Sequence, residues 1–442
     1  MKTKVLVGIV CLIILSSSSV LADWPQYLGP ERNGISPETS LASSWPEDGP
    51  KVLWTNPVGK GFAGVSIQDG KVYLVDRVES TNDVIRCYDL KSGEELWHYS
   101  NEDAGEYDYN GSRNPPTIDE ENLYSVGGMG SVYCINLTSH ELVWKRDFKE
   151  DFDAEKPWWG FAQSPLLYKN LVIAAPQSAN AGAVAYDKNT GEIVWQTERL
   201  CDEPGYSSVM LTTIGGVEQI ILVTPLTDPD AVEEEDEDDE DDEDDDEEEE
   251  DEGPPFEEGG VYGINAETGE ILWNYRNFTE GVTIPPVTLI GDSRMFVTGG
   301  GGGSTMLKLR HEDGEFEVIV QFKTKEYSAH IHPALLYKEH LYMNSGGNDG
   351  LICVTLEGKV LWQSGRDPKF GRGGLIIAED KIYAVEGDKG HLYLAKATPE
   401  KYTQLGLVEE ILKGDEMWAP LALSDGKLVI RDQEKLMCLE VK

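Results

Sequence analysis

A ten-residue phrase that recurs along the chain constrains the fold more than any other feature. It reads YDLKSGEELW at 88–97, INLTSHELVW at 135–144, YDKNTGEIVW at 186–195 and INAETGEILW at 264–273, with a shortened copy, VTLEGKVLW, at 354–362. Each copy is a turn with Asp or Asn at its start and usually a Gly in the middle, and a Trp closes the strand that follows. Internal repetition with a period of roughly 40–50 residues is typical of solenoids and propellers.

The spacing of the tryptophans predicts the number of repeats. Trp54 stands upstream in KVLWTNPVG, and the steps from it along Trp97, Trp144, Trp195, Trp273 and Trp362 are 43, 47, 51, 78 and 89 residues. The 78-residue step contains an insertion, and the 89-residue step spans two repeats, with a degenerate copy near Val320. A further step ends near Leu407, so we predict eight closing strands.

Each repeat contains short runs that favour strands. In the first, KVYLV (71–75) and VIRCYDL (84–90) alternate and are rich in Val, Ile and Tyr, and EELWHYS follows the turn. Four short strands per repeat describe a propeller blade. We therefore predict an all-β, eight-bladed β-propeller over residues 51–442, with four-stranded antiparallel blades and little helix.

The two ends of the repeat region suggest how the ring closes. The chain ends just after LMCLEV, which has no outer strand of its own, and it begins its repeats with the isolated strand 51–58. We predict that residues 51–58 complete the last blade, which leaves no unpaired edge. A closed ring of this kind is expected to be monomeric.

The repeated phrase has a structural explanation. Asp and Asn side chains at 89, 136, 187 and 265 can bond to the backbone of their own turn, and glycines at 93, 191 and 269 supply a positive φ at little cost. The tryptophan offers a large flat surface for packing between blades. We assign a structural docking role to six residues: Trp54, Trp97, Trp144, Trp195, Trp273 and Trp362.

Residues 1–22 resemble a secretory signal peptide, with two lysines, an apolar stretch, and Val20 and Ala22 placed for cleavage after Ala22. No Cys follows the cleavage site directly, so a lipid anchor is not supported, and no other stretch of the sequence is apolar enough to span a membrane. We expect a secreted or periplasmic protein that begins with an N-terminal extension over 23–50.

Four of the cysteines occupy one repeat position. Cys87, Cys134, Cys353 and Cys438 stand where other repeats have Ala185 and Gly263. Equivalent positions on facing sheets lie about 10 Å apart, too far for a disulfide. We expect buried core thiols, and Cys201 has no evident partner.

The net charge is −44, and residues 233–252 are twenty consecutive Asp or Glu, so the rest of the chain still carries −24. This charge argues against nucleic acid as a partner. The acidic run lies in a segment, 228–258, that we expect to be a disordered insertion within one blade. The alternative function for the run is weak binding of Ca²⁺ or of a basic partner.

The phrase from Ala185 to Trp195 resembles the tryptophan-docking motif of the pyrroloquinoline-quinone (PQQ) type propellers. Two further stretches are similar to secreted bacterial members of that family, DWPQYLGPERNGIS (23–36) and the segment from GRGGLIIAEDKIYAVEGDKG to the C-terminus. The family includes eight-bladed quinoprotein alcohol dehydrogenases and the outer-membrane assembly scaffold BamB. The resemblance covers essentially the whole mature chain and implies the propeller fold.

The catalytic features that the resemblance implies for a dehydrogenase are missing. Those enzymes hold PQQ against a disulfide of adjacent cysteines, whereas no two cysteines here are closer than 47 residues. The Glu, Asn and Asp that bind Ca²⁺ in those enzymes match no motif here, and there is no C-x-x-C-H haem site. The leading hypothesis is a BamB-like binding or scaffold module of the cell envelope, with an envelope protein or a small molecule as its partner. The alternative is a quinoprotein oxidoreductase that uses PQQ with calcium, and a third class, a sugar-binding or polysaccharide-processing propeller, fits the aromatic loops.

Function in propellers concentrates in the connections near the axis, and several connections here are rich in Arg and aromatic residues, which commonly anchor ligands. The candidate ligand-binding residues are Lys60, Arg113, Trp158, Trp159, Phe161, His330, His332, Arg372 and Trp418. His330 and His332 alternate on what we predict to be a strand, a spacing at which two imidazoles can share a metal. No third ligand is evident, and we predict no metal site.

Overall fold

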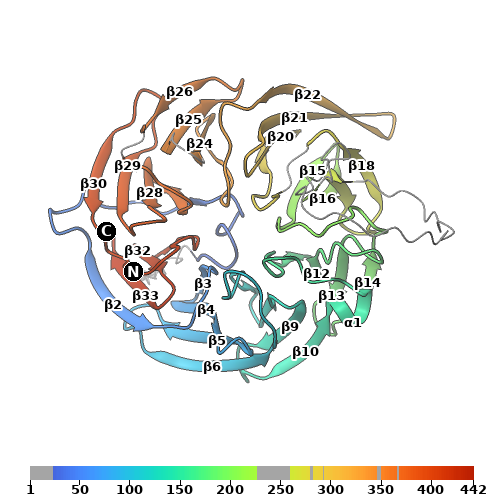
Figure 1. Ribbon diagram of the computed structural model, residues 1–442, viewed down its shortest axis with the longest axis horizontal. Helices are drawn as coiled ribbons and strands as arrows, with labels where there is room; N and C mark the ends of the chain where they lie inside the picture. Colours follow the sequence, from blue (N-terminus) through green and yellow to red (C-terminus); the bar gives the residue numbers. More distant parts are fainter. Residues whose placement is uncertain (1–22, 226–258, 279–281, 292, 346–349, 366–367) are drawn as a thin grey trace, which may run out of the picture.

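The computed structural model describes residues 23–225, 259–278, 282–291, 293–345, 350–365 and 368–442. The predicted signal peptide (1–22) and the acidic insertion (228–258) lie outside the described residues. Eight sheets form a closed ring (Figure 1), which confirms the eight-bladed propeller. Among the described residues, the only helix is the five-residue α1 (Phe148–Phe152).

In blades 1 to 7, four antiparallel strands follow one another in sequence order from the axis to the rim, and blade 7 carries the short strand β1 (Ile35–Ser36) as a parallel addition at its inner edge. Blade 8 takes its outer strand from the segment that precedes blade 1. Blades 1 to 4 contain β3 (Val65–Gln68), β4 (Lys71–Val78), β5 (Asn82–Asp89), β6 (Glu95–Glu102); β7 (Thr117–Ile118), β8 (Asn122–Val126), β9 (Ser131–Asn136), β10 (Leu142–Asp147); β11 (Leu166–Tyr168), β12 (Leu171–Ala174), β13 (Val184–Asp187), β14 (Ile193–Gln196); and β15 (Met210–Ile214), β16 (Val217–Thr224), β17 (Gly260–Asn265), β18 (Ile271–Tyr275). Blades 5 to 8 contain β19 (Thr288–Ile290), β20 (Arg294–Gly299), β21 (Gly303–Glu312), β22 (Glu315–Thr324); β23 (Leu335–Tyr337), β24 (His340–Ser345), β25 (Gly350–Thr355), β26 (Val360–Gln363); β27 (Leu375–Ala378), β28 (Lys381–Val385), β29 (Leu392–Lys396), β30 (Gln404–Val408); and β31 (Ala422–Ser424), β32 (Lys427–Arg431), β33 (Lys435–Glu440), β2 (Lys51–Pro57). The degenerate outer strands near Val320 and Leu407 are therefore real, as β22 and β30.

The ring closes as predicted. The blue strand β2 lies beside the red strand β33 in Figure 1, and its register runs from the Lys51–Glu440 pair to the Pro57–Lys435 pair. The first strand of the repeat region thus becomes the outer strand of the last blade.

The docking tryptophans act between neighbouring blades. Trp144 stands opposite Cys134 within its own blade, and its Nε1 donates a hydrogen bond of 2.9 Å to the Lys188 carbonyl in the next blade. Its ring covers Gly191, where an added Cβ would lie 2.7 Å from Trp144 Cδ2. Two features therefore favour glycine at this position of the phrase: the positive φ, and the Trp ring of the previous blade, which leaves no room for a Cβ.

The same arrangement repeats around the ring, with informative exceptions. Trp54 covers Gly93 and donates to the Leu90 carbonyl, and the other three cysteines of the repeat also stand opposite their Trp as buried free thiols. Where the phrase has His140 in place of Gly, Trp97 stacks on the imidazole with ring centroids 4.6 Å apart.

Replacing Gly191 with Ala should test this docking contact. Gly191 and Gly216 both have a positive φ, 71° and 81°, but an added Cβ at Gly216 meets nothing within 4 Å. Both substitutions carry the left-handed cost of about 1–2 kcal/mol, and overpacking against Trp144 adds about 1–3 kcal/mol for Gly191→Ala alone. Urea unfolding of both variants measures the difference, and equal losses would contradict the docking role.

The N-terminal extension was not predicted to have a fixed path, and it packs against the inner strands of several blades. Trp24 bridges to Ile67 of β3, β1 (Ile35–Ser36) pairs in parallel with β27, and Gly426 N–H donates to Glu38. These partners lie at the far ends of the inner strands or in the hairpins that follow them, opposite the connections between blades. The three contacts therefore lie on the face of the ring away from those connections.

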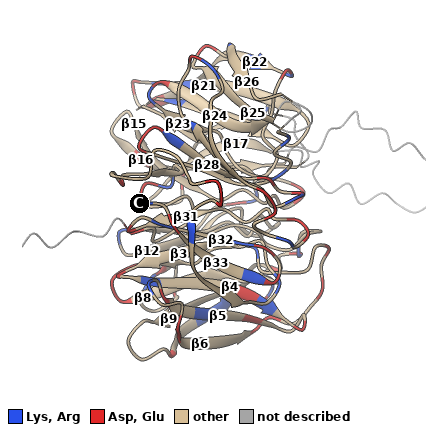
Figure 2. Cartoon of the chain, turned by 90° about the vertical axis from the view of Figure 1, so that its left-hand side faces the viewer, with Lys and Arg blue, Asp and Glu red and all other residues tan. Residues whose placement is uncertain are grey.

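Charged residues lie mainly in loops. Figure 2, in which Asp and Glu are red, shows acidic positions along the loops at both faces of the ring. Three arginines, Arg32, Arg77 and Arg431, are nevertheless buried. Arg32 of the extension donates from its guanidinium to the carbonyls of Pro165, Ser164 and Val209 at 3.1–3.2 Å. Burial lowers the pKa of Arg32 to about 10, so it still carries a charge at neutral pH. No helix among the described residues is long and apolar enough to cross a membrane.

Candidate functional site

The connections between blades converge on a cavity of about 210 Å³ near the axis. All eight connections contribute to its wall, and the N-terminal extension adds Tyr27. The lining residues are Tyr27, Phe62, Tyr109, Arg113, Asn114, Pro115, Trp159, Ala162, Ser164, Tyr206, Ser208, Ile284, His330, Ile331, His332, Arg372, Trp418 and Pro420. Tyr27 shows that the extension also reaches the cavity wall.

Aromatic rings form much of the wall. Phe62 and Tyr109 each lie 5.4 Å from the Trp418 ring, centroid to centroid, and Trp159 lies 5.2 Å from Tyr206. The five rings come from five different inter-blade connections, so the contacts between them hold these loops against one another. Such a wall suits a flat or apolar ligand group.

Two arginines flank this aromatic wall. The guanidinium of Arg113 lies 4.7 Å from the centroid of Phe62, and that of Arg372 lies 5.0 Å from the centroid of Trp418. Arg113 donates to the carbonyls of Trp159 (2.9 Å) and Asp108 (2.7 Å), and burial lowers its pKa to about 10. No carboxylate lines the cavity among the described residues, and Glu416 of the adjoining groove is close enough to interact electrostatically with both arginines.

Several polar atoms of the wall are buried without a hydrogen-bond partner in the described structure. They are Trp418 Nε1, His330 Nδ1 and Asn114 Oδ1. A buried polar group without a partner costs free energy. Burial and the nearby charge of Arg372 lower the pKa of His330, which favours its neutral form.

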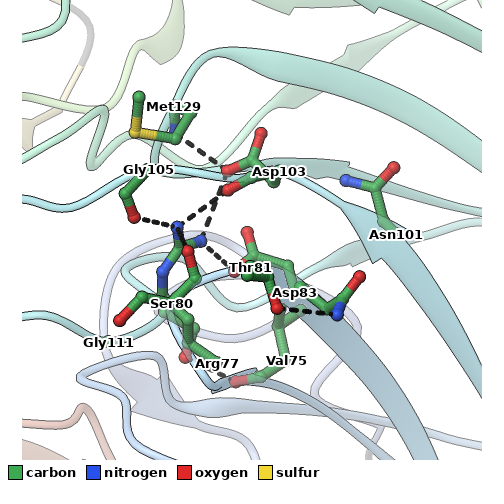
Figure 3. Close-up of polar contacts among 12 residues, drawn as sticks. Val75, Arg77, Ser80, Thr81, Asp83, Asn101, Asp103, Gly105, Gly111 and Met129 are labelled. Atoms are coloured by element: carbon green, nitrogen blue, oxygen red, sulfur yellow. Dashed lines mark hydrogen bonds and ion pairs between the residues drawn. The ribbon is translucent and has the colours of Figure 1, made fainter.

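The loop that carries Tyr109 and Arg113 is held by a buried ionic network (Figure 3). Arg77 pairs with Asp83 (2.8 Å) and Asp103 (3.5 Å), and all three side chains are almost fully buried. Arg77 also donates to the carbonyls of Asp103 and Gly105, both at 2.8 Å. Burial and the neighbouring Asp103 raise the pKa of Asp83 to about 7. The network fixes the start of the loop whose end enters the cavity.

His332 is buried, and its Nε2–H donates to the Trp418 carbonyl at 2.9 Å. Burial lowers its pKa to about 4, whereas an unfolded His titrates near 6.5. The unfolded state therefore gains a proton first, and stability is lost as the pH falls from about 6.5 to about 4.

Replacing His332 with Gln tests this effect. Urea unfolding at pH 7 and pH 4 measures how much unfolding free energy the protein loses on acidification, and we expect His332→Gln to lower that loss by up to about 3 kcal/mol. An unaltered pH dependence would contradict this.

The structure brings six of the nine predicted site residues together in the cavity wall: Arg113, Trp159, His330, His332, Arg372 and Trp418. Lys60 lies in a neighbouring groove. Trp158 is 70% exposed and Phe161 is buried in the core against Phe148, so neither lines the cavity. The predicted strand at 330–332 is wrong, because both histidines lie in the connection between β22 and β23.

The cavity wall also contains Tyr27, Tyr109 and Tyr206, which are not among the predicted site residues. Tyr109 lies in the connection that also carries the predicted residue Arg113, and Tyr206 lies one connection beyond Trp159 and beside its ring, so their place between blades is a signal in the sequence. Tyr27 gave none, since the extension carries no repeat.

The residues of the cavity fit PQQ with calcium only in part. The arginines and rings suit a planar anion, but the described wall offers no carboxylate to Ca²⁺, which prefers such oxygen ligands. No group of three or more His, Cys, Asp or Glu in the described part of the chain is arranged to hold a metal ion.

The fold and the axial cavity define this protein as a closed propeller with a pocket formed by its inter-blade connections. A family model described as outer membrane protein assembly factor BamB matches residues 80–224 and 257–436. Since these ranges cover more than half of the chain, the protein belongs to this family.

Solved structures share the fold at low sequence identity. A quinohemoprotein alcohol dehydrogenase from Comamonas testosteroni has a TM-score of 0.63 and 12% identity, over 95% of this chain and 80% of that one. BamB from Moraxella catarrhalis has a TM-score of 0.58 and 11% identity, over 88% and 99%. A europium-containing methanol dehydrogenase has a TM-score of 0.64 and 12% identity, over 92% and 89%. The search of curated proteins found no match.

Proposed function

We propose that the protein is a binding module of the cell envelope that uses the axial cavity as its ligand site. The observation that carries the proposal is the convergence of all eight inter-blade connections on one pocket with two arginines and an aromatic wall. Arg113 and Arg372 select an anionic group, and the rings accommodate an apolar body. Secretion rests on the signal sequence at 1–22, and a mature N-terminus at Asp23 in the envelope or secreted fraction would support it.

Binding can be tested with a probe of the right chemistry, anilinonaphthalene sulfonate, which is anionic and aromatic. We expect its fluorescence to rise on the wild type and its affinity to fall at least about tenfold in Arg372→Gln, because a charge-assisted contact contributes about 1.5–3 kcal/mol. Arg310→Gln is the matched control, since Arg310 lies exposed in the long hairpin of blade 5. Absence of probe binding, or equal loss in both variants, would refute the proposal.

The second candidate, a quinone-dependent oxidoreductase, is favoured by the structural similarity to alcohol and methanol dehydrogenases. Dye reduction with PQQ, Ca²⁺ or a lanthanide ion, and a panel of alcohols tests it. Because the cavity lacks a described carboxylate, we expect no activity. Turnover that depends on Arg372 or Trp418 would replace the binding-module proposal with this one.

A further inference from the structure

A groove of about 810 Å³ adjoins the axial cavity on the same face of the ring. The two hollows share Phe62 and Tyr109 in their walls, so they lie side by side. The groove lies between the β2–β3 connection, which carries Lys60, the β4–β5 hairpin and the segment 413–416. It is almost four times as large as the cavity, which indicates a ligand longer than a single small acid.

We propose that this pair of hollows binds the carboxyl-terminal end of an extended peptide. The cavity takes the terminal carboxylate and the last side chain, and the groove takes the residues before them. This inference rests on the proposed function, because it uses the same cavity and specifies its ligand.

The cavity offers the donors that a carboxylate needs. The Arg372 guanidinium lies on one face of the Trp418 ring, and Trp418 Nε1 is a buried donor without a partner in the described structure. The Arg113 guanidinium lies over the ring of Phe62, which in turn packs beside Trp418. The charge of Arg113 also attracts an anion. A carboxylate with two oxygens can accept from the guanidinium and the indole together.

The size and lining of the cavity indicate the last side chain. About 210 Å³ bounded by Phe62, Tyr109, Trp159, Tyr206 and Trp418 leaves room for one large apolar group. Ring-to-ring contacts of this kind stabilise an aromatic guest beyond its buried area. We therefore infer that the bound peptide ends in an aromatic residue.

The charges of the groove favour a peptide over an acidic oligosaccharide. Its wall contains four carboxylates, Glu79, Asp415, Glu416 and Glu434. Of its cations, Arg77 is already paired with Asp83 and Asp103. An oligouronate carries a negative charge on every sugar and would be repelled there, whereas a peptide has its carboxylate only at the end that enters the cavity. The groove fits neutral or basic residues upstream.

Calorimetry with synthetic peptides tests the proposal. The hexapeptide Gly-Ser-Lys-Gly-Lys-Phe with a free carboxylate should bind, and its C-terminal amide should bind at least about tenfold more weakly. Arg372→Gln should weaken the acid peptide by a similar factor, while Arg310→Gln should not. N-acetylphenylalanine, which reaches only the cavity, should also bind at least about tenfold more weakly than the hexapeptide.

Three results would overturn the proposal: equal affinity for acid and amide, no binding of either peptide, or tighter binding of trigalacturonate than of the acid peptide. Equal affinity for N-acetylphenylalanine and the hexapeptide would eliminate the groove from the site. The amide comparison uses the unaltered protein, so it does not depend on how well a variant folds. If anilinonaphthalene sulfonate still binds in an Arg372-dependent way, only the peptide inference fails; if it does not, the proposed function fails too.

Discussion

Removal of residues 23–58 should abolish cooperative folding. The deletion takes away β2, so the whole of β33 loses its outer partner, and it removes the contacts of the extension with β3 and β27. Trp24 and Trp54 are both buried, and the loss of each buried aromatic side chain costs about 3–5 kcal/mol. Together these losses approach the 5–15 kcal/mol of stability that a typical domain has. Circular dichroism and urea unfolding should show no sigmoidal transition.

A rearranged chain provides the control. In a circular permutant that begins at Gly59, with residues 23–58 attached after Lys442 through a long Gly-Ser linker, the same contacts are available in a new order. We expect this permutant to unfold cooperatively, because β2 pairs with the C-terminal strand β33. Trp54→Ala should lower the free energy of unfolding strongly, because Trp54 is buried. Trp158→Ala should lower it by less than about 0.5 kcal/mol, because the Trp158 side chain is 70% exposed. A truncated protein with the wild-type midpoint would contradict the closure.

The fold was predictable because its main contacts are encoded in a repeat. The Trp of each phrase, the small residue opposite it (Cys, Ala or Gly) and the turn of the next blade form one contact, so the spacing of the phrases determines the blade count even where single copies have degenerated, as at Val320. The path of the N-terminal extension was not predictable. Its contacts, such as Arg32 with the Ser164 and Val209 carbonyls, join residues more than 130 positions apart without any periodic signal.

The site was predictable as a set of loops but not residue by residue. Trp158 and Trp159 are adjacent in sequence, yet the first faces solvent, where its Nε1 donates to Asp108, and the second lines the cavity. Phe161, two positions further, packs in the core. The direction of each side chain depends on loop conformation, which is fixed by contacts between different connections, such as the Arg113–Trp159 hydrogen bond.

The second large effect is expected at Arg77. Arg77→Met leaves Asp83 and Asp103 buried without their counter-ion, and loss of one partner from a buried pair costs about 3–5 kcal/mol. The folded-state pKa of Asp83 is already raised to about 7, and the substitution should raise it further. A carboxyl group whose folded pKa is raised loses stability as the pH rises above its unfolded value, near 4. The variant should therefore be weakest above pH 7 and partly recover towards pH 5.

A comparison of three variants by urea unfolding at pH 5 and pH 8 separates this network from general loss of an arginine. Arg310→Met removes an exposed ion pair with Glu317 and should cost at most about 1 kcal/mol at either pH. The triple variant Arg77→Met, Asp83→Asn, Asp103→Asn removes the buried charges as well, and it should lose the pH dependence that Arg77→Met shows. Because Arg77 holds the loop that ends at Arg113, Arg77→Met should also weaken binding of anilinonaphthalene sulfonate. Equal losses for Arg77→Met and Arg310→Met would show that the network contributes nothing beyond a surface pair.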